Sequence, residues 1–242
     1  MNLCIDIGNT RVKLAIFDSN RRCKKVFVQA SFEVQFIDDL FDQWKITKVI
    51  LSATGTLPNE WLFFLQQKEI KIVELNADVA LPIINRYASP STLGNDRLSV
   101  VVAAQDLFPK QHVLVVDAGT CITYDFVEAT GEYWGGAILP GIQMRFRSMA
   151  HFTAKLPEVK ALKPASFIGD TTTHSLQSGV MYGVLHELNG FKAQYEQQFG
   201  QLKLIITGGD ASYFESQLKN EIFAEPNLVL MGLNTILEYN SK

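Results

Sequence analysis

Asn2-Leu-Cys-Ile-Asp6-Ile-Gly8-Asn-Thr10-Arg-Val-Lys13 opens the chain and continues as Leu-Ala-Ile-Phe17. Two short apolar runs, Leu3–Ile5 and Val12–Phe17, are typical of buried strands. The polar turn between them holds Gly8 and Asn9, residue types that tolerate positive φ in a tight hairpin. Its backbone N–H groups suit phosphate oxygens, and the Asp6 carboxylate suits a hydrated Mg²⁺. Taken alone, this stretch favours an ordinary tight hairpin in which Asp6 caps the turn.

The same pattern occurs a second time. Leu114-Val-Val-Asp117-Ala-Gly119-Thr120 is again an apolar run that ends in Asp-x-Gly-Thr, and Cys121–Val127 follows as the second strand. A little less than half of the 242 residues separates the two copies. Repetition at this spacing indicates two copies of one supersecondary unit. We therefore expect two hairpins, with Asp6 facing Asp117, that hold a polyphosphate from both sides.

Three further motifs lie on either side of the second copy: Leu93-Gly94-Asn95-Asp96-Arg97, Gly135-Gly-x-Ile-x-Pro-Gly141 and Thr207-Gly208-Gly209. With these motifs in this order, the chain resembles the actin, Hsp70 and sugar-kinase superfamily, and within it the type III pantothenate kinases. The resemblance implies an α/β fold of two duplicated ribonuclease-H-like lobes, with mixed sheets flanked by helices. It also implies ATP-dependent phosphorylation of pantothenate to 4'-phosphopantothenate, the first step of coenzyme A biosynthesis.

The predicted lobes are residues 1–111, with the first hairpin and the substrate motif, and residues 112–242, with the second hairpin, the nucleoside site and a dimer helix. In the first lobe we expect strands at Cys23–Ala30, Lys48–Ser52 and Ile70–Leu75, helices at Phe32–Trp44, Asn59–Gln67 and Leu98–Leu107, and an ordered loop at Leu81–Leu93. In the second lobe we expect strands at Val113–Asp117, Cys121–Val127, Tyr133–Ile138, Leu204–Ile206 and Leu228–Leu230, and helices at Ile142–Phe152, Thr171–Phe199, from Asp210 to Lys219 and at Leu233–Tyr239.

The phosphate-binding residues follow from the hairpins and from the resemblance. The predicted ATP site consists of Asp6, Ile7, Gly8, Asn9, Thr10, Arg11, Val12, Lys13, Thr120, Gly208 and Gly209. Lys13 either points at phosphate or lies on the exposed face of its strand. We expect Asp6 to hold the Mg²⁺ of ATP through water, and the resemblance assigns a monovalent cation, K⁺ or NH₄⁺, to Asp117. A pair of turn-capping aspartates is the alternative for these two residues.

The acceptor alcohol needs a group that takes its proton. Asp96 opens a predicted helix, whose dipole stabilises the ionised carboxylate, and we expect it to be the catalytic proton acceptor. An ordinary first-turn aspartate would look the same in the sequence. Arg97 would neutralise the phosphoryl group or a substrate carboxylate. The resemblance completes the predicted substrate site with Tyr87, Gly94, Asn95 and Thr172, although Asp170 and Thr171 depart from the family's commoner residues before Thr172.

Composition excludes several other classes. With 22 Lys and Arg against 25 Asp and Glu, the net charge is −3, and no basic stripe indicates nucleic-acid binding. No apolar run approaches the ~20 residues that cross a bilayer, and no leader precedes the first strand, so we expect a cytoplasmic protein without a membrane partner. Three scattered cysteines agree with a reducing compartment. The sequence contains neither a P-loop nor a Gly-x-Ser-x-Gly elbow.

The resemblance further implies a homodimer, and Gly179 and Gly183 share a face of the longest predicted helix, where a second helix could approach closely. Two alternatives from other classes remain. One is a nucleotide-binding regulator of the same fold that transfers no phosphate. The other is a phosphatase or polyphosphate hydrolase of the superfamily. The Gly94–Arg97 motif favours the kinase over both.

Overall fold

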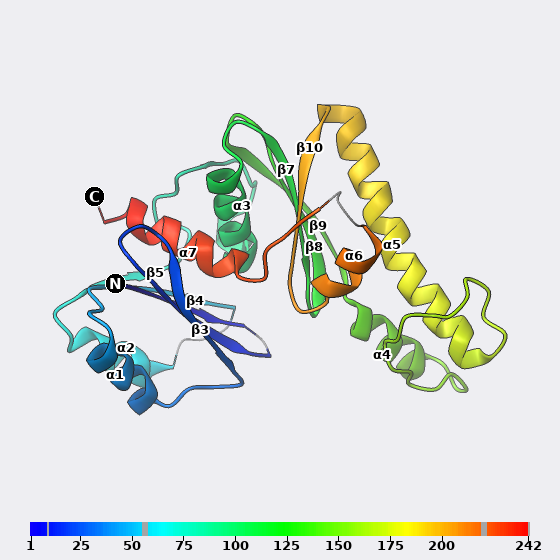
Figure 1. Ribbon diagram of the computed structural model, residues 1–242, viewed down its shortest axis with the longest axis horizontal. Helices are drawn as coiled ribbons and strands as arrows, with labels where there is room; N and C mark the ends of the chain where they lie inside the picture. The colour runs from blue at the N-terminus through cyan, green and yellow to red at the C-terminus, as the bar shows by residue number, and fades with distance from the viewer. Residues whose placement is uncertain (9, 55–57, 219–221, 242) are drawn as a thin grey trace. The chain divides into compact units, whose positions relative to one another are not determined.

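The computed structural model describes residues 1–8, 10–54, 58–218 and 222–241. The chain forms two compact units (Figure 1). The first unit contains Met1–Pro109, Thr130–Trp134 and Asn227–Lys242. The second contains Lys110–Ala129 and Gly135–Pro226. Each unit is built around its own hairpin of the repeated motif.

The first unit contains a five-stranded sheet in the order β3-β2-β1-β4-β5. Its strands are β1 (Asn2–Ile7), β2 (Val12–Phe17), β3 (Cys23–Gln29), β4 (Lys48–Ala53) and β5 (Lys71–Glu74). The β1–β2 and β2–β3 pairs are antiparallel, whereas β1–β4 and β4–β5 are parallel. On one face of the sheet, Leu3 and Ile5 are buried in a core with residues of α1 (Val34–Gln43) and α2 (Asn59–Gln66).

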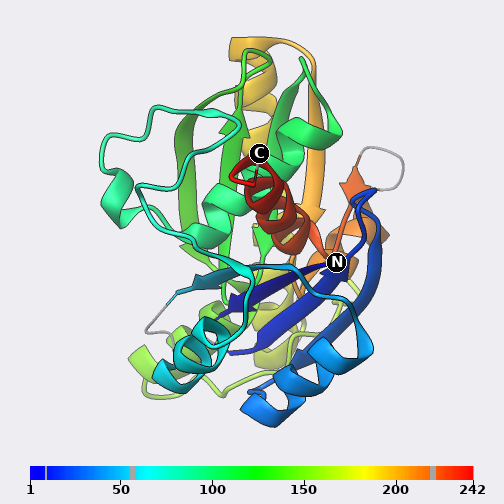
Figure 2. The same cartoon turned by 90° about the vertical axis from the view of Figure 1, so that its left-hand side faces the viewer.

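The opposite face of this sheet faces α7 (Leu228–Tyr239), which also packs along α3 (Asn95–Leu107). Asn2 fixes the contact, because its Nδ2 donates to Oδ1 of Asn234 at 2.8 Å and to Oε1 of Glu238 at 2.7 Å. Both ends of the chain therefore belong to the first unit (Figure 2). The predicted strand at Leu228–Leu230 is wrong: these residues begin α7. A short apolar run cannot be assigned to a strand or a buried helix by periodicity alone.

The second unit repeats the topology of the first. Its sheet contains β7 (His112–Ala118), β8 (Cys121–Val127), β9 (Glu132–Pro140), β10 (Leu202–Thr207) and β11 (Phe223–Ala224) in the order β11-β10-β7-β8-β9. This order matches that of the first sheet: β7 corresponds to β1, β8 and β9 to β2 and β3, and β10 and β11 to β4 and β5. The β7–β8 pair is antiparallel and the β7–β10 and β10–β11 pairs are parallel, as in the first unit. The duplicated mixed sheets confirm the predicted fold class.

Three helices belong to the second unit: α4 (Ile142–Phe152), α5 (Thr172–Phe199) and α6 (Ala211–Gln217). Val180, Val184 and Leu188 of α5 are buried in one core with residues of β7, β8 and β10. The predicted end of α6 at Lys219 lies outside the described residues. Most other predicted boundaries agree within two residues, but α3 begins at Asn95, three residues before the predicted Leu98. No helix in the described part of the chain is long and apolar enough to cross a membrane.

The predicted boundary near residue 111 separates the two copies of the repeated motif. The division into lobes 1–111 and 112–242 stays a prediction. By contacts, α7 and Thr130–Trp134 belong to the first unit, although both lie in the predicted second half. Helix α7 packs on α3 and β1, and Thr130–Trp134 joins the first unit through the predicted loop Leu81–Leu93. This loop contains a short strand, β6 (Ile84–Asn85), which pairs with Glu132 and Tyr133 at the start of β9, and a 3₁₀ turn, η1 (Pro90–Thr92).

Candidate active site

Asp6 lies inside β1, on the face of the sheet that α7 and α3 cover. In the strand register its neighbours are Lys13 on β2 and Ser52 on β4, and Ser52 Oγ donates to Asp6 Oδ1 at 3.3 Å. Burial raises the pKa of Asp6 to about 6; the negative charge of Asp96 adds to this, whereas Lys13 and Ser52 oppose it. The first unit therefore brings Asp6, Lys13 and Asp96 within electrostatic reach of one another. The Mg²⁺ role of Asp6 and the turn-capping alternative both stay predictions. Whether Lys13 contacts phosphate stays a prediction.

The first glycine turn is tight. Gly8 N donates to Arg11 O at 3.0 Å, and a Cβ on Gly8 would lie 3.1 Å from the same oxygen. Ile7 and Val12 close the turn as a registered pair at the ends of β1 and β2. Thr10 and Arg11 are exposed at its tip. Asn9 lies outside the described residues, so the prediction for its side chain is not examined by the structure.

The second glycine turn is enclosed by two other glycine segments of its unit. Gly119 N donates to Cys121 O at 2.9 Å, and Gly141 N donates to Thr120 O at 3.1 Å. A Cβ on Gly141 would lie 2.3 Å from Gly119 O. The Gly135–Gly141 motif thus ends where the backbone must pass directly over the turn, and only glycine leaves room for this approach.

Gly208 approaches the same turn from the end of β10. It has a φ of +94°, and a Cβ there would lie 2.4 Å from Ala118 O and 2.5 Å from Asp117 Oδ1. Asp210 N donates to Ala118 O at 2.9 Å. The structure therefore brings together four of the residues predicted for the nucleotide and the monovalent cation: Asp117, Thr120, Gly208 and Gly209.

Asp96 lies in the first turn of α3, directly after the N-cap Gly94 and Asn95. Its Oδ1 accepts from Arg97 N at 2.8 Å, so the carboxylate folds over the start of the helix. A Cβ on Gly94 would lie 2.4 Å from this oxygen, so a larger residue there would force the Asp96 carboxylate to move. The side chain is half-buried and lies where the helix dipole favours an anion. The predicted position at the start of a helix is confirmed, and the role of Asp96 as proton acceptor stays a prediction.

Arg97 and Tyr87 are also brought together. The Arg97 side chain is buried, and its guanidinium carbon lies 5.6 Å from the centre of the Tyr87 ring. Behind it, the Tyr87 ring stacks on the fully buried Tyr133, with 6.3 Å between ring centres and 9° between ring planes. The sequence analysis missed Tyr133, because nothing in its pattern separates it from any other aromatic core residue of a strand.

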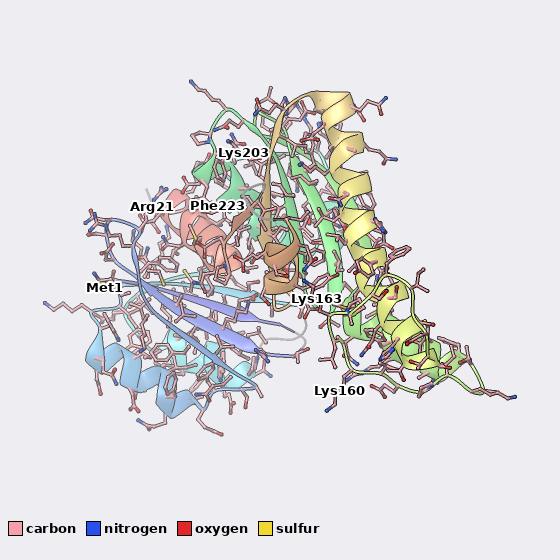
Figure 3. All side chains as sticks on the ribbon, turned by 45° about the vertical axis from the view of Figure 1, so that its right-hand side comes forward. Met1, Arg21, Lys160, Lys163, Lys203 and Phe223 are labelled. Atoms are coloured by element: carbon pink, nitrogen blue, oxygen red, sulfur yellow. The ribbon has the colours of Figure 1, made fainter. Side chains whose placement is uncertain are left out.

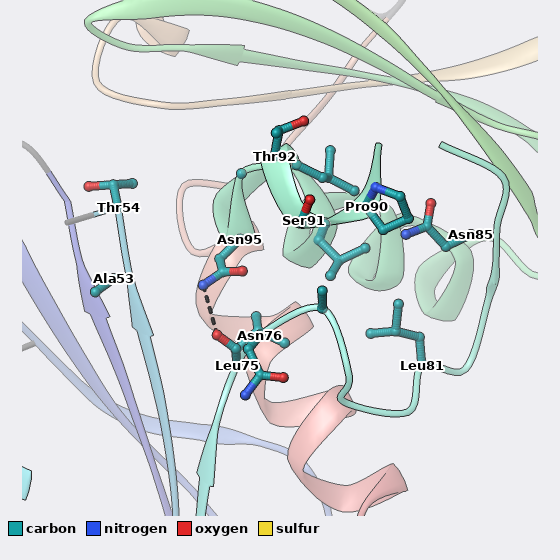
Figure 4. A pocket seen from close by; sticks show the side chains of 14 residues that line it. Ala53, Thr54, Leu75, Asn76, Leu81, Asn85, Pro90, Ser91, Thr92 and Asn95 are labelled. Atoms are coloured by element: carbon teal, nitrogen blue, oxygen red, sulfur yellow. Dashed lines mark hydrogen bonds between the residues drawn. The ribbon is translucent and has the colours of Figure 1, made fainter. Parts of the chain in front are cut away.

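A cavity of about 380 Å³ opens in the first unit beside the start of α3 (Figure 4). It lies after the carboxyl ends of β4 and β5, the edge at which open α/β sheets bind ligands. The predicted residues Gly94 and Asn95 are part of its wall. The sequence analysis missed the other polar residues of the lining, which the fold collects from separate segments: Thr54, Asn76, Asn85, Ser91 and Thr92. None of the described lining residues is charged.

Thr172, the remaining predicted substrate residue, begins α5 in the second unit. It lines a second cavity, of about 460 Å³, with Arg145, Ser148 and Ser175 among other residues. The two residues that depart from the family pattern support this helix end. Thr171 Oγ1 accepts from His174 N at 3.1 Å, and Asp170 Oδ1 pairs with His174 Nδ1 at 2.5 Å. The hydrogen bond from His174 lowers the pKa of Asp170.

Comparison with known proteins places the chain among named relatives. Residues 2–194 match the model of the family described as type III pantothenate kinase. A type III pantothenate kinase from Christiangramia forsetii is 44% identical over 242 residues, which are 99% of each chain. Among solved structures, a candidate Baf family transcriptional activator from Campylobacter jejuni gives a TM-score of 0.63 at 23% identity over 98% of each chain. A candidate 2-dehydro-3-deoxygalactonokinase from Sinorhizobium meliloti gives 0.58 at 12% identity, over 100% of this chain and 99% of that one. At these identities the two structures support the fold alone.

Proposed function

We infer that this chain, which belongs to the type III pantothenate kinase family, transfers a phosphoryl group from ATP to pantothenate. The product is 4'-phosphopantothenate, and the reaction is the first step of coenzyme A biosynthesis. The observation that carries this inference is the position of Asp96 in the first unit. It lies at the start of a helix, next in sequence to two residues that line an uncharged cavity, and close enough to Asp6 to raise its pKa.

The acceptor is proposed to bind in the 380 Å³ cavity, whose volume falls in the usual range for small-molecule sites. Asp96 would take the proton of the primary hydroxyl as transfer proceeds. In a loose transition state this transfer comes late, so positioning matters more than basicity. Arg97 is held against Tyr87, and its fixed positive charge would neutralise negative charge on the substrate.

The two glycine turns are proposed to bind ATP. The Thr10 hydroxyl and the backbone N–H groups of the first turn other than that of Gly8, which donates to Arg11 O, would hold one part of the triphosphate, and Thr120 would hold another. Gly208 and Gly209 would lie against the nucleoside, where the absence of side chains lets a flat ring approach the backbone. The close packing of Gly208 on the second turn supports this assignment, because it places the residues proposed for phosphate and for nucleoside side by side.

Two cations are proposed as cofactors. No cluster of three or more acidic, histidine or cysteine side chains occurs among the described residues. This fits Mg²⁺ bound to ATP, because that ion usually keeps several waters and takes only one or two carboxylates along with the phosphates. Asp6 would hold it through water, and Asp117, beside the Ala118 carbonyl, would hold K⁺ or NH₄⁺. Bound there, the cations would supply neutralisation of the phosphate charge.

The test is an assay of ADP release with purified protein, Mg-ATP and pantothenate, with and without K⁺. We expect ADP to form only when pantothenate is present and in equal amount to the phosphorylated product. A phosphatase would release inorganic phosphate without an alcohol, and a regulator would release no ADP, so either result would reject the kinase. Asp96→Asn should bind ATP normally and lose turnover by about 10²–10⁴-fold.

We also propose a homodimer formed through the second unit. Phe152, Leu162, Phe167 and Ile168 are largely exposed there, in α4 and in the segment that leads to α5. This segment also carries Lys160 and Lys163 (Figure 3). Exposed apolar groups of this size are typical of interaction sites.

The Gly179 and Gly183 face of α5 supports the same proposal, because a Cβ at either residue would meet nothing within 4 Å. Sedimentation of the wild type should give a dimer. Gly179→Leu combined with Phe167→Glu should give a monomer with unchanged secondary structure. A wild type that sediments as a monomer at assay concentrations would reject the proposal.

A further inference from the structure

Two asparagine side chains in the cavity of the first unit have their amide orientation fixed by the backbone. Asn95 Nδ2 donates to Leu75 O at 2.9 Å, which leaves Oδ1 as the acceptor that the side chain can offer. Asn85 Oδ1 accepts from Tyr87 N at 3.0 Å, which leaves Nδ2 as the donor. A flip of either amide would exchange its oxygen and its nitrogen. The hydrogen bond to the backbone would then be lost, because the oxygen can only accept and the nitrogen can only donate.

Both of these atoms are turned into the cavity. Figure 4 shows Asn95 with its oxygen directed into the cavity from one wall and Asn85 with its nitrogen directed into it from another. Asn95 precedes Asp96 in α3, whereas Asn85 lies in β6. The cavity therefore presents an acceptor close to the proposed reaction centre and a donor elsewhere in its lining.

We propose that Asn85 is a specificity-determining residue. Its Nδ2 donates to an acceptor oxygen on the arm of the substrate remote from the reacting hydroxyl, while Asn95 Oδ1 accepts from a donor next to that hydroxyl. The proposal for Asn85 rests on the proposed function, and it explains how the same site would recognise its substrate. Pantothenate carries its polar groups in this order: a second hydroxyl beside the reacting end, then an amide carbonyl, and a carboxylate at the far end.

The uncharged lining supports this reading. A neutral donor can hold an amide carbonyl or a carboxylate, and a hydrogen bond to a charged group is worth more than one to a neutral group. A substrate whose remote arm ended in a donor, such as an amine, would leave Asn85 Nδ2 unsatisfied, and an unsatisfied buried donor is costly. The cavity would thus select for an oxygen acceptor at that end.

Asn85→Asp tests the proposal. The variant keeps the size of the side chain and the oxygen that accepts from Tyr87 N, but it replaces the donor by a second carboxylate oxygen. KM is measured for pantothenate and for its alcohol analogue, in which a hydroxymethyl group replaces the carboxylate. KM does not depend on the fraction of folded enzyme, so partial misfolding cannot imitate the result.

We expect KM for pantothenate to rise by about 10- to 100-fold with little change in kcat. A rise for pantothenate alone identifies the carboxylate as the partner of Asn85, and a rise for both substrates identifies the amide carbonyl. An unchanged KM for both overturns the proposal while leaving the kinase function intact. Failure of the wild type to phosphorylate pantothenate would instead refute the function itself.

The matched control is Asn76→Asp. Asn76 lines the same cavity, but its Oδ1 accepts from Asp78 N at 2.9 Å and its Nδ2 donates to Glu74 O at 3.2 Å. The Asn76→Asp variant brings the same negative charge into the cavity and leaves the proposed donor, Asn85 Nδ2, in place. We expect its KM for pantothenate to rise less than that of Asn85→Asp. An equal rise would overturn the proposal, because it would assign the effect to negative charge anywhere in the cavity.

Discussion

Ser52 and Asp6 are paired across the parallel strands β1 and β4, and the Ser52 hydroxyl donates to the Asp6 carboxylate at 3.3 Å. Both side chains are buried. Burial favours the protonated form of Asp6, and the hydrogen bond from Ser52 partly opposes this by stabilising the ionised carboxylate. The first unit therefore keeps an unfavourable charge at the residue that is proposed to act on Mg-ATP.

Asp6→Asn should stabilise the protein in the absence of ligands at neutral pH. The pKa of Asp6 is raised from 3.8 to about 6 in the folded protein, so the folded state binds a proton more tightly than the unfolded state does. Stability from this group is present below pH 3.8 and is lost as the pH rises through 6. At pH 7.5 the loss amounts to at most about 3 kcal/mol, which the asparagine would recover.

The measurement is thermal unfolding of both proteins from pH 4 to pH 8. The variant should unfold at a higher temperature at pH 7.5, and the difference should shrink towards zero near pH 4. A constant difference across this range would contradict the assignment of the effect to the Asp6 charge. The variant should also lose activity.

Ser52→Ala should raise the pKa of Asp6 above that of the wild type, because the hydroxyl hydrogen bond stabilises the ionised form. The pKa can be followed by carbon NMR of the labelled carboxyl group. Ser99→Ala is the matched control: Ser99 is also buried in this unit, but its hydroxyl donates to the backbone oxygen of Asn95. A Ser52→Ala variant in which Asp6 titrates as in the wild type would show that the hydrogen bond has no effect.

Gly208→Ala should weaken ATP binding and destabilise the second unit, whereas Gly209→Ala should leave the stability of that unit unchanged. The first substitution forces a Cβ to within 2.5 Å of Ala118 O and Asp117 Oδ1 at a φ of +94°. The conformation alone costs about 1–2 kcal/mol. A Cβ on Gly209 meets nothing within 4 Å. Calorimetric titration with ATP and thermal unfolding measure both effects, and equal behaviour of the two variants would refute the prediction.

Tyr133→Leu should raise KM for pantothenate about 2- to 10-fold, because the stacked ring that supports Tyr87 is lost and such pairs are worth about 0.5–1.5 kcal/mol. Tyr133→Phe keeps the ring and should restore a KM close to that of the wild type. Steady-state kinetics of both variants provides the test. A change confined to kcat in Tyr133→Leu would argue against a role in positioning Tyr87 and Arg97.

Much of the fold could be predicted because the decisive patterns are local and occur twice. The Asp6 and Asp117 turns, each between two apolar runs, indicated the duplicated sheet. The residues after the Gly94 motif indicated α3, although its predicted start was three residues too late. The assignment of Leu228–Leu230 failed because a short apolar run is buried equally well in a helix. The mutual proximity of Asp117 and Gly208 could be expected only from the resemblance, because local sequence patterns do not predict contacts between residues that are far apart in the chain.

The sequence by itself determined the local features that the chain can offer: two glycine turns, each directly after an aspartate-containing strand, and an aspartate at the start of a helix. Only the tertiary structure decided the shape and polarity of the acceptor cavity. Thr54, Asn76, Asn85 and Ser91 come from separate segments, and nothing in their local sequence relates them. Their amide and hydroxyl groups acquire a direction only when backbone atoms such as Leu75 O and Tyr87 N fix them, and those contacts exist only in the folded chain.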